Sequence, residues 1–256
     1  MPVLETVAEV LADNGLITAF AFVGLVVWLS YLVANRLTDG RIHGSAIAIL
    51  VGLVLAWVGG VVTGGTRGLA DIEILAGVGI LGGAMIRDFA IVATAFGVNF
   101  DEIRRAGIGA VLSLLVGVFG SFAVGGAVAY AFGYTDAVSI TTIGAGAATY
   151  IVGPVTGTAI GASSDVIALS IAAGLVKSML VMIGTPFVAR AIHLDNPRSA
   201  MIFGGLMGTT SGVAGGLAAT DPRLVPYGAM TATFYTGLGA LLGPSVFYFA
   251  VRAVFG

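Results

Sequence analysis

The chain has 256 residues, of which 58% are hydrophobic and 9% charged, with a mean hydropathy of +1.06 and a formal net charge of −2. Soluble domains average about 25% charged residues, so this composition predicts an integral membrane protein. The sequence has no basic tract that would bind nucleic acid. It has no cysteine, which excludes disulfides and thiolate metal sites.

The first two apolar stretches, Leu16–Ala34 and Ser45–Thr63, are each long enough to span a bilayer. Residues 1–15, before the first stretch, carry acidic residues and lack a basic region, so we expect no cleavable signal peptide. The second stretch carries small residues at every fourth position, which suits either an interface or ordinary helix packing. This stripe consists of Gly52, Ala56, Gly60 and Gly64.

A third stretch, Asp71–Phe96, contains the adjacent charges Arg87 and Asp88. Charges at membrane depth are costly and often functional, so Arg87 is a candidate substrate ligand and Asp88 a candidate sodium ligand. The same pair would also suit a short loop between two shorter segments. The sequence leaves both interpretations open.

Three further spans are expected at Ala106–Phe132, Asp165–Arg190 and about 227–252. Lys177 is the only lysine of the chain and falls near the middle of the second of these spans. Asp165 and Asp221 each open an apolar stretch, where we expect them to cap helices. No nucleophile elbow, HExxH or phosphate-binding loop is present, so we do not expect an enzyme.

Two glycine-rich and hydroxyl-rich stretches, Ser139–Asp165 and Gly204–Asp221, interrupt this pattern. Glycine and proline loosen the helical hydrogen-bond ladder, which membranes tolerate only inside protein or beside water. Paired broken segments indicate the binding site of a secondary transporter. Weak similarity between Thr156–Arg190 and Ser211–Arg252 suggests an internal repeat, although glycine-rich segments can also resemble one another by chance.

The arginine distribution between loops favours re-entrant hairpins for both broken stretches. The resulting expectation is an all-α integral membrane protein with about six transmembrane helices and two re-entrant hairpins that form an inverted repeat. Both termini would lie outside. Residues 1–137 would form scaffold and interface helices, and residues 138–256 an elevator-like transport domain with hairpin-plus-helix units at 138–190 and 199–252.

The broken stretches offer ligands for an anion and for sodium, because helix N-termini bind anions and hydroxyls with unwound carbonyls bind small cations. For any single threonine, a bond to its own helix is the alternative. A dianion would also need a cationic partner, either Lys177 or Arg87. The candidate substrate ligands are Thr141, Thr142, Thr209, Thr210, Ser211, Lys177 and Arg87. The candidate sodium ligands are Thr156, Thr158, Gly208, Gly212 and Asp88. We expect sodium as coupling ion, no transition metal and no organic cofactor.

Three long runs resemble the MadM-type subunit of malonate/sodium symporters over roughly Ile74–Pro244. They are GGAMIRDFAIVATAFGVNFDEIRRAG, YTDAVSITTIGAGAATYIVGPVTGTAIGASSDVIALSIAAGLVKS and DNPRSAMIFGGLMGTTSGVAGGLAATDPRLVPYGAMTATFYTG. The resemblance implies sodium-coupled uptake of malonate, with a small MadL-type membrane subunit as obligate partner. It also implies a bacterial-type inner membrane location, and a homo-oligomer of the two-subunit complex is an open option.

A fainter likeness, carried by SITT at 139–142 and DNPR at 195–198, is to the LrgB/CidB holin-like family. It implies a channel or exporter subunit tied to murein hydrolase control. A sodium-pumping subunit of a decarboxylase complex is a further alternative. The exact dicarboxylate and the sodium stoichiometry are not encoded in any motif.

Overall fold

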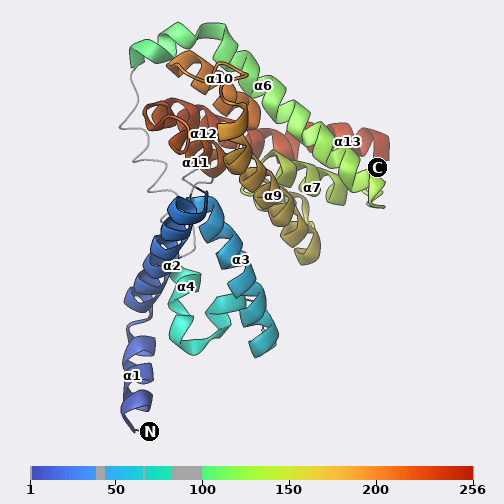
Figure 1. Ribbon diagram of the computed structural model, residues 1–256. Coiled ribbons are helices and arrows are strands. Elements are labelled where there is room, and N and C mark those ends of the chain that lie inside the picture. Colours follow the sequence, from blue (N-terminus) through green and yellow to red (C-terminus); the bar gives the residue numbers. More distant parts are fainter. Residues whose placement is uncertain (1, 39–43, 66, 82–99, 256) are drawn as a thin grey trace. The chain divides into compact units, whose positions relative to one another are not determined.

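The computed structural model describes residues 2–38, 44–65, 67–81 and 100–255, and every regular element in those ranges is helical (Figure 1). The chain divides into two compact units, Met1–Ala93 and Thr94–Gly256. Five described segments are long and apolar enough to cross a membrane, which confirms a multi-pass helical protein. They are Gly15–Thr38, Ile47–Leu75, Gly107–Ala131, Ser164–Val188 and Pro222–Phe255.

These segments coincide with five of the six expected spans. The remaining expected span, Asp71–Phe96, falls mostly outside the described residues, and its described part forms only short helices. The re-entrant hairpins, the inverted repeat and the scaffold boundary at residue 137 stay predictions.

The first unit is a small helical assembly in which α2 packs against α3 and α4. One residue of the expected small stripe makes a close approach there: a Cβ added at Gly68 would lie 3.2 Å from the Cβ of Ala56. A Cβ added at Gly52 would meet no described atom within 4 Å. The elements are α1 (Pro2–Asp13), α2 (Gly15–Thr38), α3 (Gly44–Thr63), η1 (Gly68–Asp71), η2 (Glu73–Leu75) and α4 (Gly77–Leu81).

The second unit is built on the long helix α6, which packs along α7 and α10 (Figure 1). Small residues permit this packing, because a Cβ at Gly117 would strike the carbonyl of Gly205 and one at Gly125 would strike the side chain of Ala147. The elements are α6 (Phe100–Ala131), α7 (Ala137–Ala148), α8 (Val152–Ile160), α9 (Ser164–Val188), α10 (Pro197–Met207), α11 (Thr210–Ala218), η3 (Pro222–Leu224), α12 (Val225–Leu242), η4 (Gly243–Phe247) and α13 (Tyr248–Phe255).

The first broken stretch forms the helix pair α7–α8, with its break at residues 149–151. Asp136 starts α7 by accepting a 2.8 Å hydrogen bond from the Ser139 amide. A Cβ added at Gly153 would lie 2.8 Å from the Cα of Gly146, and one added at Gly157 would lie 2.7 Å from Cγ2 of Thr142. Four residues further along α8, from Gly153 to Gly157, the contact on α7 lies four residues earlier, at Thr142 instead of Gly146. The two helices therefore pack antiparallel.

The second broken stretch forms α10 and α11, which are separated at Gly208 and Thr209. A capping box at Asn196 starts α10, and Gly208 ends it in the left-handed conformation at φ 70°. Thr209 then caps α11. The two helices hardly contact each other: α10 lies against α6 and α12, and α11 lies against α9 and α12.

The Gly/Pro sequences near the ends of α9 and α12 have different backbone structures. Pro186 lies inside α9, which continues to Val188. At Gly243–Phe247, by contrast, the backbone forms a π-helical segment between α12 and α13. Asp221 caps η3 as expected, whereas the cap of α9 is Ser163, and Asp165 lies in the first turn.

Candidate functional site

The centre of the candidate site is Lys177, which lies near the middle of α9. Its Nζ donates to the Ala148 carbonyl at 2.8 Å, to Ser121 Oγ at 2.9 Å and to Tyr235 Oη at 3.3 Å. An ammonium group has three N–H donors, so all three have an acceptor. These oxygens come from α7, α6 and α12. Helix α7 packs directly on α9, and α6 and α12 both contact α7.

The contact with Ala148 places a positive charge at the C-terminal end of α7. Ala148 is the last residue of that helix, and its carbonyl belongs to the final turn, where no intrahelical donor remains. Carbonyls there form the negative end of the helix dipole, so a cation is favoured. Lys177 thereby satisfies the end of a helix that stops inside the unit.

Tyr235 holds this arrangement in place from α12. Its side chain is fully buried, and its hydroxyl donates to the Gly117 carbonyl at 3.0 Å while accepting from Lys177. The Lys177 ammonium also lies 5.1 Å from the centre of the Tyr235 ring, within the range of a cation–π interaction.

No carboxylate within the described residues forms an ion pair with Lys177; ion pairs such as Arg67–Asp71 and Arg223–Asp221 lie elsewhere in those residues. A buried or half-buried cation that lacks a counter-ion favours binding of an anion from outside. The surroundings of Lys177 are therefore electrostatically suited to a carboxylate ligand.

Lys177 and Ser121 face a cavity of about 730 Å³ between α6, α7, α9 and α10. Most of its lining is apolar, which is the usual composition of a site for a small ligand with a few polar anchors. The apolar lining includes Val116, Val124, Ile143, Leu180 and Met207.

The α10–α11 break meets α9 one residue further along, at Ser178. Thr209 Oγ1 donates to Ser178 Oγ at 2.8 Å, and Ser178 Oγ and Ser211 Oγ share a further 2.8 Å hydrogen bond. Thr209 Oγ1 also accepts from the Gly212 amide at 3.4 Å. The start of α11 is thus tied to the helix that carries Lys177.

Tyr235 also contacts this second break. A Cβ added at Gly208 would fall on the Tyr235 ring, so only glycine leaves room for the ring, and the φ of 70° favours glycine as well. Tyr235 consequently contacts the α10–α11 break with its ring and the ammonium at the end of α7 with its hydroxyl.

The predicted threonine ligands have different positions. Thr142 donates at 2.8 Å to the Val138 carbonyl of its own helix, and Thr158 is exposed. Thr141 and Thr156 are fully buried, and their hydroxyls, like that of Thr210, have no hydrogen-bond partner among the described residues.

The remaining predicted ligands contribute backbone or fall outside the described residues. A Cβ added at Gly212 would lie 2.7 Å from the Ser178 carbonyl, so Gly212 allows close packing of α11 on α9. Arg87 and Asp88 lie outside the described residues.

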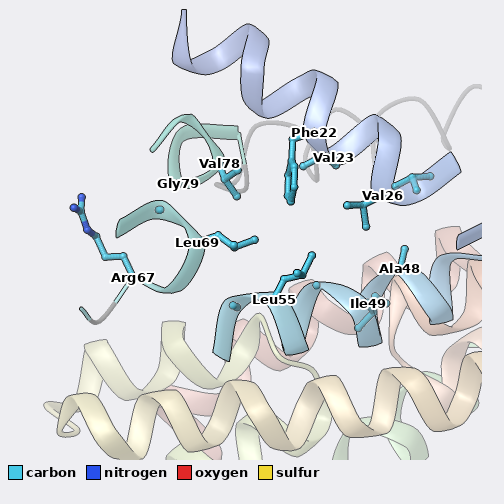
Figure 2. A pocket seen from close by; sticks show the side chains of 14 residues that line it. Phe22, Val23, Val26, Ala48, Ile49, Leu55, Arg67, Leu69, Val78 and Gly79 are labelled. Atoms are coloured by element: carbon cyan, nitrogen blue, oxygen red, sulfur yellow. The ribbon is translucent and has the colours of Figure 1, made fainter. Parts of the chain in front are cut away.

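The first unit has a cavity of its own, of about 550 Å³, between α2, α3 and the segment that follows. Figure 2 shows that its labelled side chains are apolar except for Arg67, which points away from it. Arg67 instead pairs with Asp71 at 3.1 Å. Its described lining therefore offers no polar anchor for a charged ligand.

The sequence did not single out Ser178, Tyr235 or the Ala148 carbonyl. It did not single out Ser121 as a ligand either. The hydroxyl next to the single intramembrane lysine was the available signal for Ser178; Tyr235 had none, because it is one tyrosine within an apolar span.

These features define a class: a multi-pass helical membrane protein with two interrupted helices that meet beside a central lysine. Residues 7–255 match the family of the malonate/sodium symporter MadM subunit. The chain therefore belongs to that family of transporter subunits, as its sequence motifs predicted. Comparisons with the curated proteins and with the solved structures give no match.

Proposed function

We propose that this chain is the large membrane subunit of a sodium-coupled malonate symporter and that Lys177 binds a carboxylate of the substrate. The observation that carries the proposal is the Lys177 ammonium, which faces a cavity without a carboxylate partner among the described residues. Family membership supports malonate and sodium as the transported pair.

The substrate must replace one of the three acceptors of Lys177, because all its donors are used. Ser121 is the acceptor that gives way, since it faces the cavity whereas Tyr235 is fully buried. The exchange is favourable because a carboxylate carries a full negative charge that attracts the ammonium, whereas the Ser121 hydroxyl is neutral.

The start of α11 provides the second anchor for the dicarboxylate. Amides in the first turn of a helix lack intrahelical acceptors and attract anions. Thr210 Oγ1 is buried and unpartnered among the described residues, and Ser178 connects this turn to α9 beside Lys177. One carboxylate would bind Lys177 and the other the turn Thr209–Ser211.

Transport then follows by alternating access, with the unit that holds the two breaks moving against scaffold helices to import malonate. A small MadL-type subunit in the inner membrane is the proposed partner, as the family's two-subunit organisation implies. Thr156 and other oxygens at the breaks are the proposed sodium ligands.

The test is uptake of radiolabelled malonate into proteoliposomes, with and without an inward sodium gradient and with and without the small subunit. Saturable uptake that requires sodium supports the symporter. Ion flux that is independent of malonate, with no saturable uptake, would contradict it and favour the holin-like channel.

A further inference from the structure

We infer that the π-helical segment Gly243–Phe247 and the Thr156 hydroxyl form a site for a small monovalent cation, and that this ion is the coupling sodium. The inference rests on the proposed function for its biological role. The proposed cation site is distinct from the site at Lys177, and its π-helical segment carries no recognisable sequence motif.

The first observation is the Thr156 hydroxyl itself. Thr156 is 0% exposed, and its Oγ1 has no hydrogen-bond partner among the described residues. Buried polar groups nearly always have a partner, so an unpaired hydroxyl indicates a missing ligand or water. Thr141 on the antiparallel helix α7 has the same property.

The second observation is the direction of that hydroxyl. A Cβ added at Gly243 would collide with Thr156 Oγ1, and one added at Gly239 would lie 3.0 Å from Cγ2 of Val152. Four residues further along α12, from Gly239 to Gly243, the contact on α8 is also four residues further along, at Thr156 instead of Val152. The helices α8 and α12 therefore run parallel at this contact. The hydroxyl therefore points at the backbone where α12 changes into the π-helical segment.

The third observation is the change in helical hydrogen bonding at this segment. Pro244 has no amide hydrogen, so it cannot donate to the Ala240 carbonyl four residues earlier. Interrupted helices in transporters coordinate sodium with such loosened carbonyls, and π-helical segments are frequent at functional sites. Both α7 and α8 contact this segment, and Thr156 of α8 lies against its first residue, Gly243.

The chemistry favours sodium over an anion at this position. A hydroxyl oxygen and backbone carbonyls are hard, neutral oxygen ligands, the kind that alkali and alkaline-earth cations prefer. None of the described residues contributes a cluster of carboxylates and histidines for a divalent or transition metal.

The variant that removes the ligand without changing side-chain volume is Thr156→Val. We expect it to raise the half-saturating sodium concentration for malonate uptake about tenfold or more. It should also abolish thermal stabilisation of the purified complex by sodium chloride relative to choline chloride. Thr156→Ser keeps the oxygen and should retain both properties. Thr233→Val is the control and should behave as wild type, because the Thr233 hydroxyl donates to the Ala229 carbonyl of its own helix, at 2.9 Å.

Unchanged sodium dependence in Thr156→Val would overturn this site while leaving the proposed symporter intact. If wild-type uptake itself ignores sodium, the proposed function fails instead. Should Thr156→Val not fold, Gly243→Ala decides the question, because its methyl group would occupy the position of the hydroxyl. A folded Gly243→Ala complex with wild-type sodium dependence would equally overturn the site.

Discussion

The Nζ of Lys177 lies 2.8 Å from the carbonyl oxygen of Ala148, the last residue of α7. The protein thus places its one lysine at the end of an interrupted helix and near the middle of a membrane-spanning one. A neutral hydrogen-bond donor would have been enough to pair the Ala148 carbonyl. A charged group there gives the site an additional capacity to attract anions.

Ser121 and Tyr235 contribute unequally to substrate binding if the carboxylate displaces Ser121. Ser121→Ala removes only the acceptor that gives way, so the half-saturating malonate concentration should change by less than about threefold. Tyr235→Phe keeps the ring beside Gly208 but removes the hydroxyl that positions Lys177, and it should raise that concentration by about tenfold. A severe defect in Ser121→Ala together with normal uptake by Tyr235→Phe would contradict the proposed exchange.

Ser178 is predicted to stabilise the start of α11. Its replacement by alanine leaves the buried Thr209 hydroxyl without its acceptor, at a cost of about 1–3 kcal/mol in the free energy of unfolding. Ser170→Ala is the matched control on α9, because the equally buried Ser170 hydroxyl donates only to Ile167 of the same helix, at 2.6 Å. Thermal unfolding in detergent compares the two variants, and equal midpoints would argue against the role of Ser178.

Gly208 is predicted to be required both for its backbone conformation and for its lack of a side chain. Gly161 is also left-handed, at φ 79°, but a Cβ there would meet no described atom within 4 Å. Gly161→Ala should therefore cost only about 1 kcal/mol, the penalty of the conformation. Gly208→Ala should cost clearly more, since the methyl group would fall on the Tyr235 ring. Thermal unfolding of both variants measures the difference in stability. Equal losses of stability would show that the Tyr235 ring moves to accommodate the methyl group.

Asp136 is predicted to make the stability of α7 depend on pH. Partial burial disfavours its carboxylate, but hydrogen bonds, the backbone bond from Ser139 foremost, lower its pKa below the ordinary 3.8. A lowered pKa stabilises the fold above pH 3.8, and this contribution is lost as the pH falls through the folded-state pKa.

The comparison for this prediction is Asp136→Asn, which keeps a capping oxygen without the charge. At pH 7 the free energy of unfolding of wild type should exceed that of the variant by about 0.5 kcal/mol, because the carboxylate interacts favourably with the helix N-terminus. The difference should shrink below pH 3.8 in thermal unfolding experiments. A difference that persists undiminished at pH 3 would contradict this assignment.

The sequence was informative about where helices break. Glycine, proline and hydroxyl-rich composition predicted both interruptions, and the two breaks fall inside the predicted stretches, at residues 149–151 and 208–209. Lys177 stood out for the same kind of reason, because a charge in an apolar span is rare. Both signals are local properties of the sequence and do not depend on which residues contact each other in the fold.

The partners themselves could not be predicted, because they are distant along the chain. Ser121 and Tyr235 lie 56 and 58 residues from Lys177. Helical phase also separates residues that look alike in sequence: Thr156 is buried whereas Thr158, two positions later, is exposed. Only the packed structure distinguishes an inward hydroxyl from an outward one.

The most direct test of the account is the affinity of the reconstituted complex for malonate when Lys177 is replaced by methionine, a side chain of similar size without charge. We expect the half-saturating malonate concentration in proteoliposome uptake to rise by about tenfold to a hundredfold, because a charge-assisted hydrogen bond is lost. Thr233→Val serves as the control, and its malonate affinity should be unchanged. Wild-type malonate affinity in a folded Lys177→Met complex would contradict the central role of Lys177.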